Sequence, residues 1–409
     1  MGYLASGNSC VSYRYEVKDF YFTVKDSRTR MKGYELKSLM IINDYIENIF
    51  PIVQLKVSMD YETYYEIIRN KDNVKIRINI QKYYTKVSDV EKSLKSQYLN
   101  TTFTLILDDD DEDLYTDIRK KNNVEGDDST SLYDQDNEVE FYLFKSSLVK
   151  ASKKKINKIL KNCNVTNAVA LVMDKMGIDN LLMSRSPNDT EYSEIIIPPL
   201  KATQAISYID TFYGLYPTGS MLFFGVDRSY LIKYDGRCTA YESGEITSTT
   251  IIVPKVGTEA SQNVGSILGD GGYTIIADYE TIEFQNQSVT KNILNGEHLQ
   301  IDNAESSEID GTMNRSGINK KIIKNRGKNK YFKSTYTRMR ESLEHVIIAQ
   351  FSDIDLSSLA PNKSYHFVFE DSALQKKYSG TYVLVKSEIA LIRKESHLSA
   401  VAKCEFRVG

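Results

Sequence analysis

The sequence has no tryptophan, and it has only four histidines and four cysteines among its 409 residues. The cysteines (Cys10, Cys163, Cys238 and Cys404) lie far apart without a CxxC pair, so the usual spacings of zinc sites and redox motifs are absent. With so few histidines, few side chains exchange protons near pH 7. These absences favour an interaction protein over an enzyme, and we expect no cofactor and no metal.

The sequence also lacks a long apolar run and a strong net charge. Nowhere do 18 apolar residues follow one another, and the first ten residues lack the basic and apolar regions of a secretory signal. Lys and Arg number 52 and Asp and Glu 55, a net charge of −3, so a general attraction to nucleic acid or anionic lipid is not expected. We therefore predict a protein made in the cytoplasm, with no membrane contact and no specific nucleic-acid binding.

Catalytic motifs are missing as well. His298, His345, His366 and His397 show no metalloprotease spacing, and no GxSxG nucleophile motif is present. The glycines of residues 268–272 lack both the Walker-loop and the GxGxxG pattern and are better explained by a turn before a strand. The pattern favours a protein without enzymatic activity.

The N-terminal part of the chain is rich in strand patterns. Val74, Ile76, Ile78 and Ile80 alternate with polar residues, which predicts a strand with one buried face. Similar patterns predict strands over 11–24, 39–42, 52–59, 101–107 and 139–144. Asp60 is a suitable N-cap for a short helix over 61–69.

A strongly acidic segment interrupts this region. Between Asp108 and Glu140 the chain has 14 acidic and 3 basic residues, which predicts an acidic loop insertion over 108–138 between two strands. An EF-hand would need Gly and Glu where Asp113 and Arg119 stand. An exposed loop is favoured, and cation binding stays open.

The middle of the chain has helical patterns. Residues 147–160 and 165–176 predict a pair of helices, the second ended by Gly177, and 201–213 predicts a third helix ended by Gly214. Between them, 194–200 is extended and contains Pro198 and Pro199. We assign a helical module to residues 148–216.

The C-terminal part returns to strand patterns, with a hairpin over 221–234 and strands over 249–253, 273–277, 345–351, 365–369, 380–391 and 398–408. Residues 285–330 are polar and predict a long loop. The basic, aromatic run 319–340 could bind nucleic acid, but a basic loop or a protein contact is favoured.

The whole chain is predicted to have an α+β fold, in which β-rich domains at 1–147 and 217–409 flank the helical module.

Three segments resemble the baseplate hub proteins of contractile-tailed bacteriophages and related phage-tail-like injection particles. These segments are SLMIINDYIENIFPIVQLKVSMDYETYYEII with the following VKIRINIQKYY (38–68 and 74–84), IIIPPLKATQAISYIDTFYGLYPTGSMLFF (195–224) and KYSGTYVLVKSEIALIRKESHLSAVAKCEFRV (377–408). The resemblance covers about a third of the chain. The acidic insertion 108–138 and the polar stretch 285–330 have no counterpart in the hub pattern.

The resemblance implies a noncatalytic virion protein of the tail baseplate, assembled in the host cytoplasm. Two tube-like β domains per chain would let a homotrimer join a sixfold tail tube protein to a threefold central spike protein, beside other baseplate proteins. The motif residues that it singles out have structural roles, in element entries, turns and aromatic contacts: Pro51, Pro198, Pro199, Tyr213, Gly214, Tyr216, Tyr378, Gly380 and Tyr382. The alternatives are another tail-tube-associated or host-surface-binding virion protein and, less favoured, a cell-wall hydrolase.

Overall fold

The structure is a computed structural model of the chain. It describes residues 12–25, 27–86, 89–106, 137–178, 180–216, 220–233, 248–257, 265–269, 272–285, 310–312, 321–323 and 346–408. Most of the acidic segment 108–138, most of the polar stretch 285–330 and most of the basic run 319–340 lie outside these residues.

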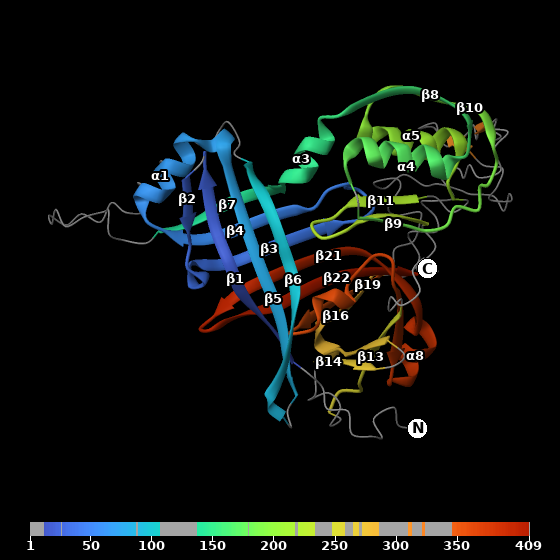
Figure 1. Cartoon of the computed structure of the whole chain (residues 1–409). Coiled ribbons are helices and arrows are strands. Elements are labelled where there is room, and N and C mark those ends of the chain that lie inside the picture. Colours follow the sequence, from blue (N-terminus) through green and yellow to red (C-terminus); the bar gives the residue numbers. More distant parts are fainter. Residues whose placement is uncertain are drawn as a thin grey trace.

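The N-terminal region consists of long antiparallel strands and one helix (Figure 1). These elements are β1 (Ser12–Val24), β2 (Ser27–Arg30), β3 (Leu36–Asp44), β4 (Ile52–Met59), α1 (Tyr61–Arg69), β5 (Val74–Lys86), β6 (Asp89–Ile106) and β7 (Asn137–Lys145). Asp60 caps α1 by accepting a hydrogen bond from Thr63 N, as predicted. The alternating isoleucines of β5 are all buried, because every second side chain of the strand faces the core.

The middle region combines helices with short strands. It contains α3 (Ser146–Ser152), β8 (Lys155–Cys163), α4 (Val165–Met176), β9 (Leu181–Met183), β10 (Tyr192–Lys201), α5 (Ala202–Tyr213), β11 (Ser220–Phe224) and β12 (Ser229–Lys233). Gly177 ends α4 with a φ of 72°, as predicted.

The predicted helix over 147–160 is wrong beyond residue 152. Residues 155–163 form β8, which pairs antiparallel with β10 and places Ile159 opposite Ile196. Ile156 and Leu160 are both buried, and residues four apart share a side in a helix and in a strand alike. The apolar spacing therefore could not separate the two structures, and pairing with a distant strand decided between them.

The C-terminal region is again mainly β. Its elements are β13 (Ser248–Val253), β14 (Gly265–Gly269), β15 (Gly272–Ile276), β16 (Ile282–Gln285), β17 (Asp310–Thr312), β18 (Lys321–Ile323), β19 (Val346–Ser352), β20 (Ser364–Phe369), α8 (Ser372–Tyr378), β21 (Gly380–Lys394) and β22 (His397–Val408). Short 3-10 turns lie at Gly33–Glu35, Lys71–Asn73, Tyr279–Thr281 and Leu356–Ser358. The stretch predicted as a polar loop contains β17 and β18, which pair with each other, and the last two residues of the predicted acidic insertion belong to β7.

One sheet runs through both β-rich regions. Its order is β14-β15-β13-β20-β21-β3-β4-β7-β6-β5-β1-β22-β19-β16, with β2 beside β1. The two regions meet where β21 pairs with β3, and again where Tyr15 of β1 faces Leu398 of β22. Figure 1 shows β21 and β22 passing below the helical part of the chain, with β1, β5 and β6 standing beside it.

The hydrophobic residues form two cores. The first lies inside the large sheet and includes residues of both β-rich regions, and the second lies among α3, α4, α5 and the β8–β10 pair. Met221 and Phe223 of β11 face the first core, whereas Leu222 and Phe224 face the second. The alternation of this one strand therefore joins the helical part to the sheet.

The α+β prediction, a mostly β chain with helices between the strands, is confirmed in outline. The predicted domain boundaries and the tube-like character of each β-rich part stay predictions. Among the described residues, no helix is long and apolar enough to cross a membrane.

Candidate functional site

The contact between the two β-rich regions is organised by the segment Asp353–Lys363, which follows β19. Asp353 has a φ of 52°, in the left-handed region. Its N–H donates to Ala400 O (2.8 Å), its carbonyl accepts from Tyr13 N (2.8 Å), and its carboxylate accepts from Ser399 Oγ (2.6 Å). These bonds hold the turn between β1 and β22.

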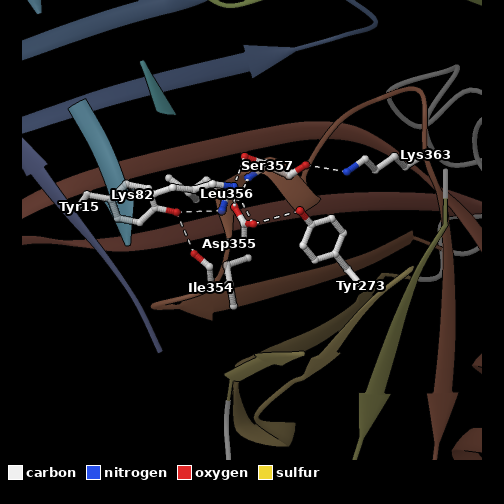
Figure 2. Close-up of polar contacts among 8 residues, drawn as sticks. All are labelled: Tyr15, Lys82, Tyr273, Ile354, Asp355, Leu356, Ser357 and Lys363. Atoms are coloured by element: carbon white, nitrogen blue, oxygen red, sulfur yellow. Dashed lines mark hydrogen bonds and ion pairs between the residues drawn. The ribbon is translucent and has the colours of Figure 1, made fainter. Parts of the chain in front are cut away.

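At the centre of this segment, Asp355 forms a buried ion pair with Lys82 of β5 (Figure 2). Lys82 Nζ lies 2.7 and 2.8 Å from the two carboxylate oxygens, and the Asp355 side chain is only 3% exposed. The Asp355 carboxylate also accepts from the Tyr273 hydroxyl (3.0 Å) and from Ser357 N (2.9 Å). A buried charge needs such a set of partners, because desolvation of an unpaired carboxylate is costly.

Tyr15 of β1 attaches the same segment to the N-terminal region. Its hydroxyl donates to Ile354 O (3.0 Å) and accepts from Leu356 N (2.9 Å). Burial first, and then the nearby Asp355 charge, raises the pKa of the Tyr15 phenol, so it stays a neutral donor. Figure 2 shows Tyr15, Lys82 and Tyr273 converging on residues 354–357 from three elements.

The motif residues of the helical module lie together at the end of α5. Gly214 ends the helix with a φ of 76°, and the Tyr213 hydroxyl accepts a hydrogen bond from Ile196 N (2.8 Å). Tyr216 is fully buried and donates to Ser184 O (2.6 Å). Asn188, which the sequence did not single out, donates to Tyr213 O (3.0 Å) and Gly214 O (2.7 Å).

The prolines occupy strand positions. Pro51 precedes β4, while Pro198 and Pro199 lie in β10 where its register against β8 shifts between Ile197 and Leu200. A proline cannot donate to a ladder, so a register shift or an open strand edge accommodates it.

Near the C-terminus, Tyr378, Gly380 and Tyr382 connect α8 to β21. The Tyr382 hydroxyl donates to Tyr378 O (2.7 Å), and burial raises the pKa of this phenol to about 12. The Tyr378 ring stacks on Phe284 of β16 (4.1 Å between centroids). The motif residues thus lie in three separate places, and the structure does not bring them into one site.

We predict that Gly214→Ala lowers the free energy of unfolding by about 1–2 kcal/mol, because alanine is strained at a positive φ. Urea denaturation checks this, with Ala373→Gly at an exposed position of α8 as a comparison for the generic effect of a glycine–alanine exchange in a helix, about 1 kcal/mol. An unchanged stability of the Gly214→Ala protein would contradict the capping role.

Within the described part of the chain, no group of three or more His, Cys, Asp or Glu side chains could hold a metal ion. His366 pairs its ring with Thr381 Oγ (3.1 Å), and His397 lies beside Ser396, so each contacts a hydroxyl.

The outer face of the large sheet extends over strands of both β-rich regions. One row across neighbouring strands places Ile106, Tyr142, Gln54, Met40, Ala390 and Val401 side by side. Ile106 and Tyr142 are about half exposed, as are Ile52 and Ile392 on the same face. The same face carries the exposed ion pairs Lys56–Glu138 and Lys386–Glu388, so apolar and charged side chains alternate on it, a mixture that surfaces in contact with other proteins also have.

Several solved structures of tail and secretion proteins are similar to this chain. Among solved structures it is similar to a tail protein from Neisseria meningitidis MC58 (TM-score 0.48, 10% identity, 96% of each chain covered). It is also similar to the 43 kDa tail protein of prophage MuSo2 from Shewanella oneidensis (0.47, 8% identity, 94% of this chain and 96% of that one) and to a component of the E. coli type VI secretion system (0.37, 7% identity, 96% and 76%). No curated protein matches the chain.

A protein-family model described as Bacteriophage PBS1 gene 109 protein matches residues 14–407, nearly the whole chain. The match includes both β-rich regions and the helical part between them. The chain therefore belongs to the Bacteriophage PBS1 gene 109 protein family.

Proposed function

We propose that this protein is a structural hub of a phage tail baseplate, a homotrimer that joins the tail tube to a central spike. The observation that carries the proposal is the pairing of β3 with β21, which places the two β-rich regions side by side. The consecutive strands β6-β7-β4-β3-β21-β22-β19-β16 then form one antiparallel face. Membership in a phage protein family supports a role in the virion.

The geometry suits a ring. On this proposal the two β regions of three chains would fill the six positions of a sixfold tube, while the trimer itself would keep the threefold symmetry of a spike. β16 pairs only with β19 among the described strands, and an edge strand can pair with another chain. The buried Lys82–Asp355 pair would keep the two regions of one chain in a fixed relation.

We expect the purified chain, alone or with its spike partner, to contain three copies, about 140 kDa for three chains of 46.7 kDa. Light scattering coupled to size-exclusion chromatography measures the mass. Electron cryomicroscopy of tail ends from particles that contain the chain should show a threefold ring between tube and spike. A single copy per particle, or density on the outer surface of the tail, would instead favour an adhesion subunit.

A further inference from the structure

A cavity of about 440 Å³ lies where the two β-rich regions meet the turn between β11 and β12. Its walls are the end of β3, the part of β6 around Tyr98, the turn residues Gly225–Arg228, and the segment Leu356–Lys363. This volume falls in the range of roughly 300–1,000 Å³ that small-molecule sites have. The motif residues and the proposed ring contacts make no use of this space.

Several polar groups on these walls form no hydrogen bond with other described residues. Among the residues that the structure describes, neither the Tyr230 hydroxyl nor the Asn362 amide has a hydrogen bond, although these residues are only 7% and 3% exposed. Buried polar groups are nearly always hydrogen-bonded. By contrast, Asn43 donates to Ser387 Oγ (3.0 Å) beside the same cavity. Neither group is among the fully buried polar atoms without a partner, which among the described residues are Asn79 Oδ1 and Ser358 Oγ. The Tyr230 hydroxyl and the Asn362 amide are therefore open to the cavity, and a ligand there can bond to them.

The mouth of the cavity has further unpaired groups. Within the described part of the chain, the Asp227 carboxylate, the Gln97 amide and the Tyr98 hydroxyl also form no hydrogen bond or ion pair. Burial first, and then the Asp227 charge, raises the pKa of the Tyr98 and Tyr230 phenols. All three residues line the same cavity, so a ligand there can meet one carboxylate acceptor and two neutral phenol donors.

The charges of the lining do not favour a strongly charged ligand. Arg228 and Lys363 line the cavity together with Asp227, so cations and an anion are both present. Lys363 Nζ already donates to Ser357 O (2.6 Å) and lies 4.8 Å from the centre of the Tyr273 ring. A phosphate would meet the Asp227 carboxylate, and an alkylammonium group would meet the two cations. A neutral ligand avoids both conflicts.

The remaining chemistry is that of a sugar site. Carboxylate and amide groups offer pairs of hydrogen-bonding atoms to neighbouring hydroxyls of a ligand, and the phenols add single donors. The rings of Tyr45, Tyr98, Tyr230 and Tyr273 supply flat apolar walls for C–H groups. We propose that this cavity binds a neutral saccharide of one or two units, through Tyr230, Asn362 and Asp227.

The test uses the full chain and the methyl glycosides of glucose, galactose, mannose and N-acetylglucosamine as probes. Saturation-transfer NMR should detect binding of at least one glycoside, and that glycoside should raise the melting temperature by about 2 °C or more at saturation. A crystal soaked with it should show the sugar between Tyr230 and Asn362. No binding by any glycoside, or only water in the soaked cavity, would overturn the proposal.

Variants separate binding from folding. Tyr230→Phe removes a hydroxyl that has no partner among the described residues, so the melting temperature of the variant should stay within about 1 °C of the wild-type value. Tyr230→Phe and Asp227→Asn should each weaken the glycoside affinity about tenfold, whereas Asp174→Asn, on the exposed side of α4, should not. Wild-type affinity in both cavity variants would overturn the assignment. Glycoside binding is measured without reference to the oligomeric state. A failure of the saccharide proposal can therefore be told apart from a failure of the hub proposal.

Discussion

Replacement of Asp355 by alanine should lower the free energy of unfolding by about 3–5 kcal/mol, the largest loss that we expect from one polar side chain of this protein. The change leaves the Lys82 ammonium, 15% exposed, without its carboxylate, and removes the acceptor of the Tyr273 hydroxyl and of Ser357 N. Urea denaturation followed by far-ultraviolet circular dichroism measures the loss.

A matched control is the exposed pair of Lys386 and Glu388 on β21, whose nitrogen and oxygen lie 2.9 Å apart. Glu388→Ala should cost at most about 1 kcal/mol, because solvent screens exposed ion pairs. The double variant Lys82→Met, Asp355→Leu should recover much of the stability, since no uncompensated charge stays buried. Equal losses for Asp355→Ala and Glu388→Ala would mean that the buried network contributes little.

The sequence predicted those parts of the fold that depend on neighbours along the chain. The alternation of β5, the Asp60 cap of α1 and the glycine ends of α4 and α5 each follow from residues within a few positions. The prediction of β8 as a helix failed, because its apolar spacing fits both structures and its partner β10 lies about 30 residues further along.

The junction and the cavity could not be predicted in the same way. Lys82 and Asp355 are 273 positions apart. From the sequence alone, each would be predicted to be an ordinary exposed charge. Asn362 and Tyr230 line one cavity only because the fold brings β6, the β11–β12 turn and the Leu356–Lys363 segment around the same space. Such sites depend on contacts between residues far apart in the sequence, and the pattern of neighbouring residues does not predict those contacts.

The second large effect concerns the joint between the two β-rich regions. Ala390 lies in the middle of β21, opposite Met40 of β3 on one side and Val401 of β22 on the other. Ala390→Pro should destabilise the protein by about 3 kcal/mol or more, because proline removes a ladder hydrogen bond from a strand that has partners on both sides. Since one core includes residues of both regions, we expect the loss to affect the whole sheet in one transition.

Ser372→Pro is the matched control for this substitution. Ser372 is the first residue of α8 and is exposed, and Asp371 before it is extended with a φ of −72° and a ψ of 124°, so proline fits there with little cost. Circular dichroism and tyrosine fluorescence should report coincident transitions in the Ser372→Pro protein, with one shared loss of stability in the Ala390→Pro protein. If Ala390→Pro instead splits unfolding into two transitions and leaves one at its original position, the β-rich regions are independent domains, and the β3–β21 pairing does not hold them as one unit.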